Sequence, residues 1–155
     1  MRLATITRLL TLAIWLMALA AGAAQAQKAV GPEAAAFKEI KVSFQVDPRV
    51  TRGMYMGEHW ISPPTYLRIG ESKTVIVPVQ AFGLDAQKRE TKIAPQWKSS
   101  NPSVVRVSPI QGHKVEITVL KAGQSDLTAT YGKLSKKLVI KSTPLAETMR
   151  VEIYQ

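Results

Sequence analysis

The chain has 155 residues, with 21 Lys and Arg against 11 Asp and Glu, and no Cys. A formal net charge of +10 predicts attraction to anionic surfaces that weakens as salt is added. The absence of Cys excludes disulfides, thiol nucleophiles, Cys-based metal sites and a lipid-modified N-terminal cysteine, so we expect the fold to depend on packing alone.

Residues 1–26 have the pattern of a secretory signal peptide. Arg2 and Arg8 give a cationic start, an apolar run follows over residues 9–21, and the sequence A-Q-A occupies 24–26. A run of about 13 apolar residues is short against the roughly 20 that span a bilayer. We therefore predict cleavage at the end of this segment, export to the periplasm or the cell surface, and no transmembrane segment after processing.

The mature chain is expected to form one domain. Residues 27–36 hold too few apolar positions for a docked helix and are predicted to be flexible, whereas residues 37–155 are predicted to share a single core. The signal peptide carries two of the 21 cations and none of the 11 acids, so the mature chain keeps a net charge of about +8. Because the exported protein is positively charged, we predict that it binds an envelope protein or an anionic glycan or lipid surface, and that it does not bind nucleic acid.

The predicted elements are strands, and the first covers residues 40–46. Apolar and polar side chains alternate over this stretch, which is the signature of a half-buried strand. Residues 75–79 alternate in the same way, but Pro78 cannot donate to a sheet ladder, so we expect this strand to lie at an edge or to be bulged. Residues 83–92 carry many charges and are predicted to form a solvated turn.

Between the first two predicted strands, periodicity disappears over residues 49–66. A loop of about 18 residues is uncommon in a compact domain and is often functional. Aromatic rings supply contact area, and arginines supply forked donors for anionic groups. We therefore predict a ligand site formed by Arg52, Tyr55, His59, Trp60, Tyr66 and Arg68. The alternative, which is the more frequent arrangement, is that these side chains cap one open end of the domain.

Further strands recur about every ten residues in the second half of the chain. They are predicted near residues 93–97, 104–107, 115–119, 127–131 and 134–140. This spacing predicts an all-β sandwich of about seven to eight strands, with the indole of Trp97 between the sheets. The other predicted core residues are Val104, Val107, Leu127 and Ala129.

The C-terminal stretch, residues 147–155, alternates in the same manner as the first strand. It is either an extra edge strand on the same sandwich or an exposed strand able to pair with another chain. Because an unpaired apolar strand is an aggregation hazard, we predict that it pairs within the domain.

Two segments carry a resemblance to a known family. They are W-K-S-S-N-P-S-V-V-R-V at 97–107 and K-A-G-Q-S-D-L-T-A-T-Y at 121–131. In this order and spacing they resemble the group 2 bacterial immunoglobulin-like domain of invasin- and intimin-type surface proteins. The resemblance covers residues 65–142. It implies a seven-strand immunoglobulin-like sandwich that serves as scaffold, spacer or adhesive surface, with no catalytic residues to carry over.

The sequence offers no constellation of catalytic residues. The two His have no metal-binding spacing, and there is no G-x-S-x-G elbow, phosphate-binding loop or D-x-D-x-D cluster. The carboxylates of Asp47, Asp85 and Asp126 are scattered, which does not favour a glycosidase pair. We therefore predict a protein that is not an enzyme and that has no catalytic residue, metal or cofactor.

The function expected from these patterns is that of an exported, non-enzymatic immunoglobulin-like binding or structural module of the bacterial cell envelope. The alternative rests on the segments 43–50 and 57–60, which are similar to immunoglobulin-like regions of exported FKBP-type prolyl isomerases. That resemblance implies an accessory domain protein associated with such an enzyme. No isomerase domain is recognised in the sequence, so no isomerase activity is expected.

Overall fold

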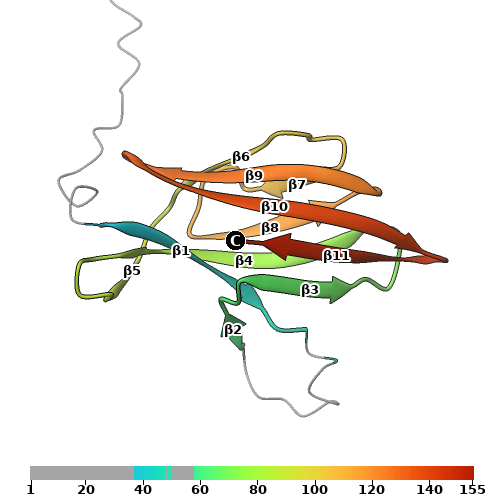
Figure 1. Ribbon diagram of the computed structural model, residues 1–155, viewed down its shortest axis with the longest axis horizontal. Helices are drawn as coiled ribbons and strands as arrows, with labels where there is room; N and C mark the ends of the chain where they lie inside the picture. Colours follow the sequence, from blue (N-terminus) through green and yellow to red (C-terminus); the bar gives the residue numbers. More distant parts are fainter. Residues whose placement is uncertain (1–36, 48, 50–57) are drawn as a thin grey trace, which may run out of the picture.

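Two antiparallel sheets face each other in the part of the chain that the computed structural model describes, residues 37–47, 49 and 58–155 (Figure 1). In the six-stranded sheet the order is β2 (Trp60–Ile61), β1 (Glu39–Gln45), β4 (Val75–Leu84), β8 (Lys114–Val119) and β7 (Val105–Ser108), and β5 (Glu90–Lys92) also pairs with β4. In the five-stranded sheet it is β3 (Thr65–Ile69), β11 (Thr148–Tyr154), β10 (Leu134–Leu145), β9 (Gly123–Tyr131) and β6 (Gln96–Ser99). The prediction of an all-β architecture is confirmed, and two antiparallel sheets are consistent with the predicted β-sandwich.

The core lies between the sheets, because alternate side chains of each strand point inward. In β1, Ile40, Val42 and Phe44 are buried, whereas Glu39 and Lys41 remain accessible. The same alternation continues in β8 and β9, and one hydrophobic cluster joins both sheets. Each fully buried apolar side chain of this kind contributes about 1.5–3 kcal/mol to the free energy of unfolding.

Trp97 lies inside this core, with 2% of its surface exposed. It stands opposite Ala129 in the ladder between β6 and β9, so its side chain shares the inner face with that buried alanine. The indole Nε1 donates a hydrogen bond to the carbonyl of Gly112 at 3.2 Å, which satisfies its only polar atom. Val104 and Leu127 are also buried, and Val107 packs against the same cluster.

The strand that contains Pro78 is central, so of the two predicted alternatives, an edge strand or a bulge, the edge strand is wrong. β4 lies between β1 and β8. The ladder with β8 covers 75–80, whereas the ladder with β1 covers 79–84. Pro78 therefore sits in the portion of β4 that pairs on one side only, where a missing backbone donor removes no bond to β1.

Residues 83–92 form part of a hairpin and are not a simple turn. β4 continues to Leu84, and β5 returns antiparallel along it. The turn itself is closed by the carboxylate of Asp85, whose Oδ1 accepts hydrogen bonds from the backbone N–H groups of Gln87 and Arg89 at 2.8 and 3.0 Å. Carboxylates favour turns because they can bond the backbone a few residues ahead.

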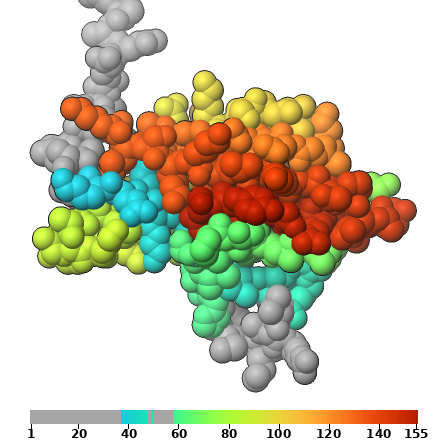
Figure 2. Space-filling model, in the orientation of Figure 1, coloured from blue at the N-terminus to red at the C-terminus, as the bar shows by residue number. Residues whose placement is uncertain are grey.

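The C-terminal strand pairs within the domain, as predicted, but it is not an edge strand. β11 pairs with β10 on one side and with β3 on the other. Figure 2 shows β11 in red as a band between β10 in orange and β3 in green. Because β3 pairs with the outer side of β11, the two edge strands of this sheet are β3 and β6.

The stretch 49–66, predicted to lack regular structure, contains two strands in its described part. β2 pairs with the end of β1, and β3 begins at Thr65. β2 has only two residues, and two prolines separate it from β3, so neither strand shows a long alternating pattern. Residues 48 and 50–57 lie outside the described part of the chain.

Candidate functional site

The residues predicted to form a ligand site lie on different surfaces. Trp60 belongs to the six-stranded sheet and His59 directly precedes it, whereas Tyr66 and Arg68 belong to the five-stranded sheet. Arg52 and Tyr55 lie outside the described residues.

Tyr66 is a core residue, which corrects its assignment to a ligand surface. Its side chain is 5% exposed, and its ring stacks on that of Phe44 with centroids 4.7 Å apart. The hydroxyl donates a hydrogen bond to the backbone carbonyl of Gln45 at 2.8 Å. Burial raises the pKa of the phenol. Because β3 and β1 belong to opposite sheets, Tyr66 ties the two sheets together.

Arg68 is engaged in a charge network. Its Nε lies 3.7 Å from the carboxylate of Asp47, which also accepts hydrogen bonds from Arg49. Hydrogen bonds from the Arg49 side chain lower the pKa of Asp47 to about 2. Arg49 in turn pairs with Glu71 at 3.0 Å. This network fixes the end of β1 against β3.

Trp60 lies over the outer face of the six-stranded sheet. Its Nε1 donates to Glu58 Oε2 at 3.3 Å, and the same carboxylate accepts from Lys114 Nζ at 3.0 Å. The ammonium is 5.3 Å from the centre of the indole, close enough for a cation–π contact. The hydrogen bond from Lys114 lowers the pKa of Glu58. These three side chains form one cluster, which we call the Trp60 cluster.

The Trp60 cluster crosses two strands. Trp60 is on β2 and Lys114 is on β8, so β1 and β4 lie between their backbones, a separation of about 14 Å at the usual strand spacing. The contact therefore requires both side chains to reach over the sheet. Between them lie Ser43 and Gln80, which are only 4% and 8% exposed although they face outward. Trp60 therefore covers part of the outer face of this sheet, which differs from the predicted cap over an open end of the domain.

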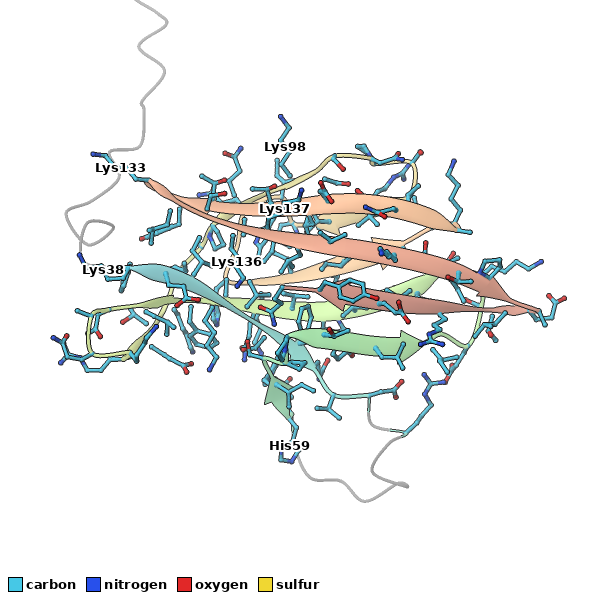
Figure 3. The ribbon with its side chains drawn as sticks, in the orientation of Figure 1. Lys38, His59, Lys98, Lys133, Lys136 and Lys137 are labelled. Atoms are coloured by element: carbon cyan, nitrogen blue, oxygen red, sulfur yellow. The ribbon has the colours of Figure 1, made fainter. Side chains whose placement is uncertain are left out.

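A second charged region lies near the β9–β10 hairpin. Figure 3 shows five labelled lysines toward this part of the molecule and His59 on the opposite side of the view. We call the five residues the lysine surface: Lys38, Lys98, Lys133, Lys136 and Lys137. They come from β6, from β10, from the turn that precedes β10 and from the residue that precedes β1.

Strand pairing brings two members of the lysine surface together. Thr128 on β9 pairs with Lys98 on β6 at one side and with Lys137 on β10 at the other. The three residues therefore form a row across the sheet. Lys38 lies near the same end of β9. The ring of the preceding residue, Phe37, has its centroid 6.2 Å from that of Tyr131, which is the last residue of β9. The sequence does not predict this surface, since Lys98 and Lys137 occupy ordinary polar positions of two strands and Lys38 and Lys133 lie just outside strands.

Most of these charges have no acidic partner among the described residues. Lys137 Nζ lies 2.6 Å from Asp126 Oδ2, but no ion pair is found there for Lys38, Lys98, Lys133 or Lys136. Lys98 and Lys133 are exposed, whereas Lys136 is half-buried at the end of the inner face. The lysine surface therefore has a local excess of positive charge.

The described residues hold no group of three His, Cys, Asp or Glu side chains that could bind a metal ion. His113 is alone: its Nδ1 lies 2.7 Å from the carbonyl of Ala81, and its buried Nε2 has no hydrogen-bond partner. Its ring meets Phe82 edge to face, with centroids 5.0 Å apart.

Among the described residues, no helix is long and apolar enough to cross a membrane.

The chain was compared with protein-family models, curated proteins and solved structures, and none of them matches it. The resemblance to the immunoglobulin-like family therefore stays a prediction. Among the described residues, the lysine surface is the best-supported candidate for a binding site.

Proposed function

We propose that the protein is an exported, non-enzymatic immunoglobulin-like module of the bacterial cell envelope, which serves adhesion or another interaction by binding an anionic glycan or lipid surface. The observation that carries this proposal is the lysine surface, where four lysines have no acidic partner among the described residues. Their potentials add at a distant anion because the charges lie on one rigid scaffold.

The shape of the site supports an extended ligand. Beside the row of Lys98, Thr128 and Lys137 runs a second row of Gln96, Thr130 and Ser135. The lysines supply charge, and the hydroxyl and amide groups supply neutral donors and acceptors. A flat sheet face with such rows suits a polymer or a layer of headgroups better than an enclosed small molecule, because ligand pockets for small molecules are concave.

The expected affinity is modest. An exposed charge pair contributes about 0.2–1 kcal/mol, so contacts to the three exposed lysines without an acidic partner among the described residues, Lys38, Lys98 and Lys133, give about 0.6–3 kcal/mol per site. That range corresponds to binding in the millimolar range or weaker for one molecule. Useful capture then requires many contacts at once along a polymer or a membrane, and it should weaken as salt screens the charges.

The experiment compares two double variants with the same net charge. Lys98→Gln/Lys133→Gln removes two exposed lysines of the lysine surface, whereas Lys73→Gln/Lys88→Gln removes two exposed lysines that pair with acids elsewhere. Binding is measured to an immobilised acidic polysaccharide and to vesicles that contain anionic phospholipid. We expect the first variant to bind about 2–30-fold more weakly than wild type and the second to change less than about twofold.

The two probes separate the two sources of negative charge. A loss that is confined to vesicles assigns the surface to lipid, and a loss that is confined to polysaccharide assigns it to glycan. Equal loss in both double variants would mean that binding depends on net charge and not on this surface, and the proposal would be wrong.

A further inference from the structure

A cleft of about 200 Å³ lies at the end of the domain that carries the β10–β11 hairpin (Figure 1). One side is the turn between β8 and β9, residues 120–122, and the other is the hairpin, which contributes Pro144, Ala146, Thr148 and Met149. The β9–β10 hairpin and the lysine surface beside it lie at the opposite end of β10. The cleft is therefore a separate candidate site.

Hydrogen bonds hold both sides of the cleft in place. On the first side, the buried Ser142 Oγ donates to the carbonyl of Lys121 at 2.8 Å and lies 3.1 Å from the carbonyl of Gly123. On the hairpin side, Thr148 Oγ1 donates to the carbonyl of Leu145 at 2.9 Å. Because both sides are fixed before a ligand arrives, little conformational entropy is lost when one binds.

The lining of the cleft is mostly apolar. It includes Leu120, Ala122, Pro144 and Met149, and Met149 is only 3% exposed. An engineered apolar cavity of about 150 Å³ binds benzene, so a cleft of about 200 Å³ suits an apolar group of about six to eight carbon atoms. The transfer of such a group from water to this lining is favourable.

Two exposed lysines, Lys73 and Lys121, also line the cleft, and none of the described lining residues is acidic. Lys73 Nζ lies 3.6 Å from Glu147 Oε2, whereas no ion pair of Lys121 is found in the described part of the chain. Two cations and one neighbouring carboxylate leave a local charge of about +1. This charge matches one carboxylate better than a phosphate monoester, which carries about −1.5 to −2.

We propose that the cleft binds a medium-chain carboxylate. Its chain of about six to eight carbons packs against Leu120, Ala122 and Met149, and its head group lies beside Lys73 and Lys121. A concave apolar surface with a few charged groups that fix the orientation of the ligand is the usual form of a small-molecule site. For about ten non-hydrogen atoms, an ordinary ligand efficiency corresponds to a dissociation constant of about 1–10 mM.

Octanoate is the probe, and its titration into ¹⁵N-labelled protein is followed by amide chemical shifts. We expect saturable shifts at residues 120–122 and 146–149, with a dissociation constant in the range of about 1–10 mM. Acetate carries the same charge without the chain, so it should cause no saturable shifts there over the same concentrations.

Two double variants of equal net charge test the role of the lysines. Lys73→Gln/Lys121→Gln removes both cations of the cleft and should weaken octanoate binding about 2–30-fold. Lys88→Gln/Lys92→Gln is the matched control, because Lys88 pairs with Glu39 at 3.1 Å, as Lys73 pairs with an acid, and no ion pair of Lys92 is found among the described residues. The control should change octanoate binding less than about twofold.

Ala122→Leu tests the apolar part of the site, because it fills the cleft at an exposed position and keeps both lysines. It should weaken octanoate binding at least about fivefold. If this variant folds poorly, the two lysine variants still decide the question.

The proposal is overturned if octanoate causes no saturable shifts at the cleft, or if the two lysine double variants weaken its binding equally. Lys98→Gln/Lys133→Gln, which removes charge from the lysine surface, should bind octanoate as wild type does. This inference and the proposed function can therefore fail independently.

Discussion

Trp97 and Trp60 both lie on short strands, but the fold uses them in opposite ways. The Trp97 side chain is 2% exposed and packs between the sheets, with one hydrogen bond to a backbone carbonyl. Trp60 lies over the outside of a sheet, and its polar and charged partners among the described residues are Glu58 and Lys114. An indole in a β protein is therefore a core residue only when its strand turns it inward.

The regions around the two indoles also differ in what stabilises them. Around Trp97 the neighbours are apolar, so its contribution should depend little on pH or salt. The region from the end of β1 to β3 depends on charges, including the network of Asp47, Arg49 and Arg68. Different perturbations should therefore separate the two regions.

The largest expected effect is that of Trp97→Ala. Removal of a buried indole loses its transfer free energy and leaves a cavity, so we expect the free energy of unfolding to fall by about 3–5 kcal/mol. Urea denaturation at neutral pH measures this. A loss below about 1 kcal/mol, the range of an exposed side chain, would show that the indole is not part of the core.

The next effect concerns Asp47 and pH. Its pKa of about 2 lies below the ordinary value of 3.8, so its ionised form stabilises the folded state. This contribution of about 2 kcal/mol is fully present above the ordinary pKa and is lost as pH falls through the folded pKa. Asp47→Asn should therefore destabilise the protein at pH near 6 and much less at pH near 2.

The measurement is the difference in urea midpoint between variant and wild type at the two pH values, since other groups titrate in both proteins. Glu71→Gln is the control, because Glu71 is a second carboxylate beside Arg49 but its side chain is 75% exposed. An exposed pair of this kind should contribute less than about 1 kcal/mol. A constant difference between Asp47→Asn and wild type across the pH range would contradict the network.

The sequence was sufficient to predict the fold where apolar residues alternate over a long stretch. β1, β8 and the second half of β9 follow this pattern, and the burial of Leu127 and Ala129 agrees with it. β2 and β3 were not predicted, because two and five residues are too short for a periodicity to show. Their pairing partners are distant in the sequence, and only the folded sheet reveals them.

The candidate site was less predictable for the same reason. The network of Arg68 and Asp47 joins β3 to the segment after β1, which are distant in the sequence, so the sequence suggested a free cation where the fold has an ion pair. The lysine surface depends on register: Lys98 and Lys137 meet across Thr128, although they are far apart in the chain. Local sequence patterns report which face a residue occupies, but not which residues stand opposite it.

The smallest expected effect is that of Trp60→Ala, and it decides between the two roles considered for this indole. If Trp60 caps the sheet over Ser43 and Gln80, its loss exposes that strip and removes the cation–π contact with Lys114. We expect the free energy of unfolding to fall by about 1 kcal/mol. Binding of the folded protein to acidic polysaccharide should not change, because the proposed lysine surface is elsewhere.

Two measurements on Trp60→Ala, a urea midpoint and a binding curve, therefore give opposite patterns for the two roles. A cap lowers the midpoint and leaves the affinity intact, whereas a ligand contact leaves the midpoint intact and lowers the affinity. Lys114→Gln is the matched variant, because it removes the cation over the indole while keeping the ring. If Trp60 is a cap, this change should cost less than Trp60→Ala, about 0.5 kcal/mol, because most of the covering area remains. If Trp60→Ala instead binds polysaccharide more weakly while its stability is unchanged, the ligand site lies around Trp60.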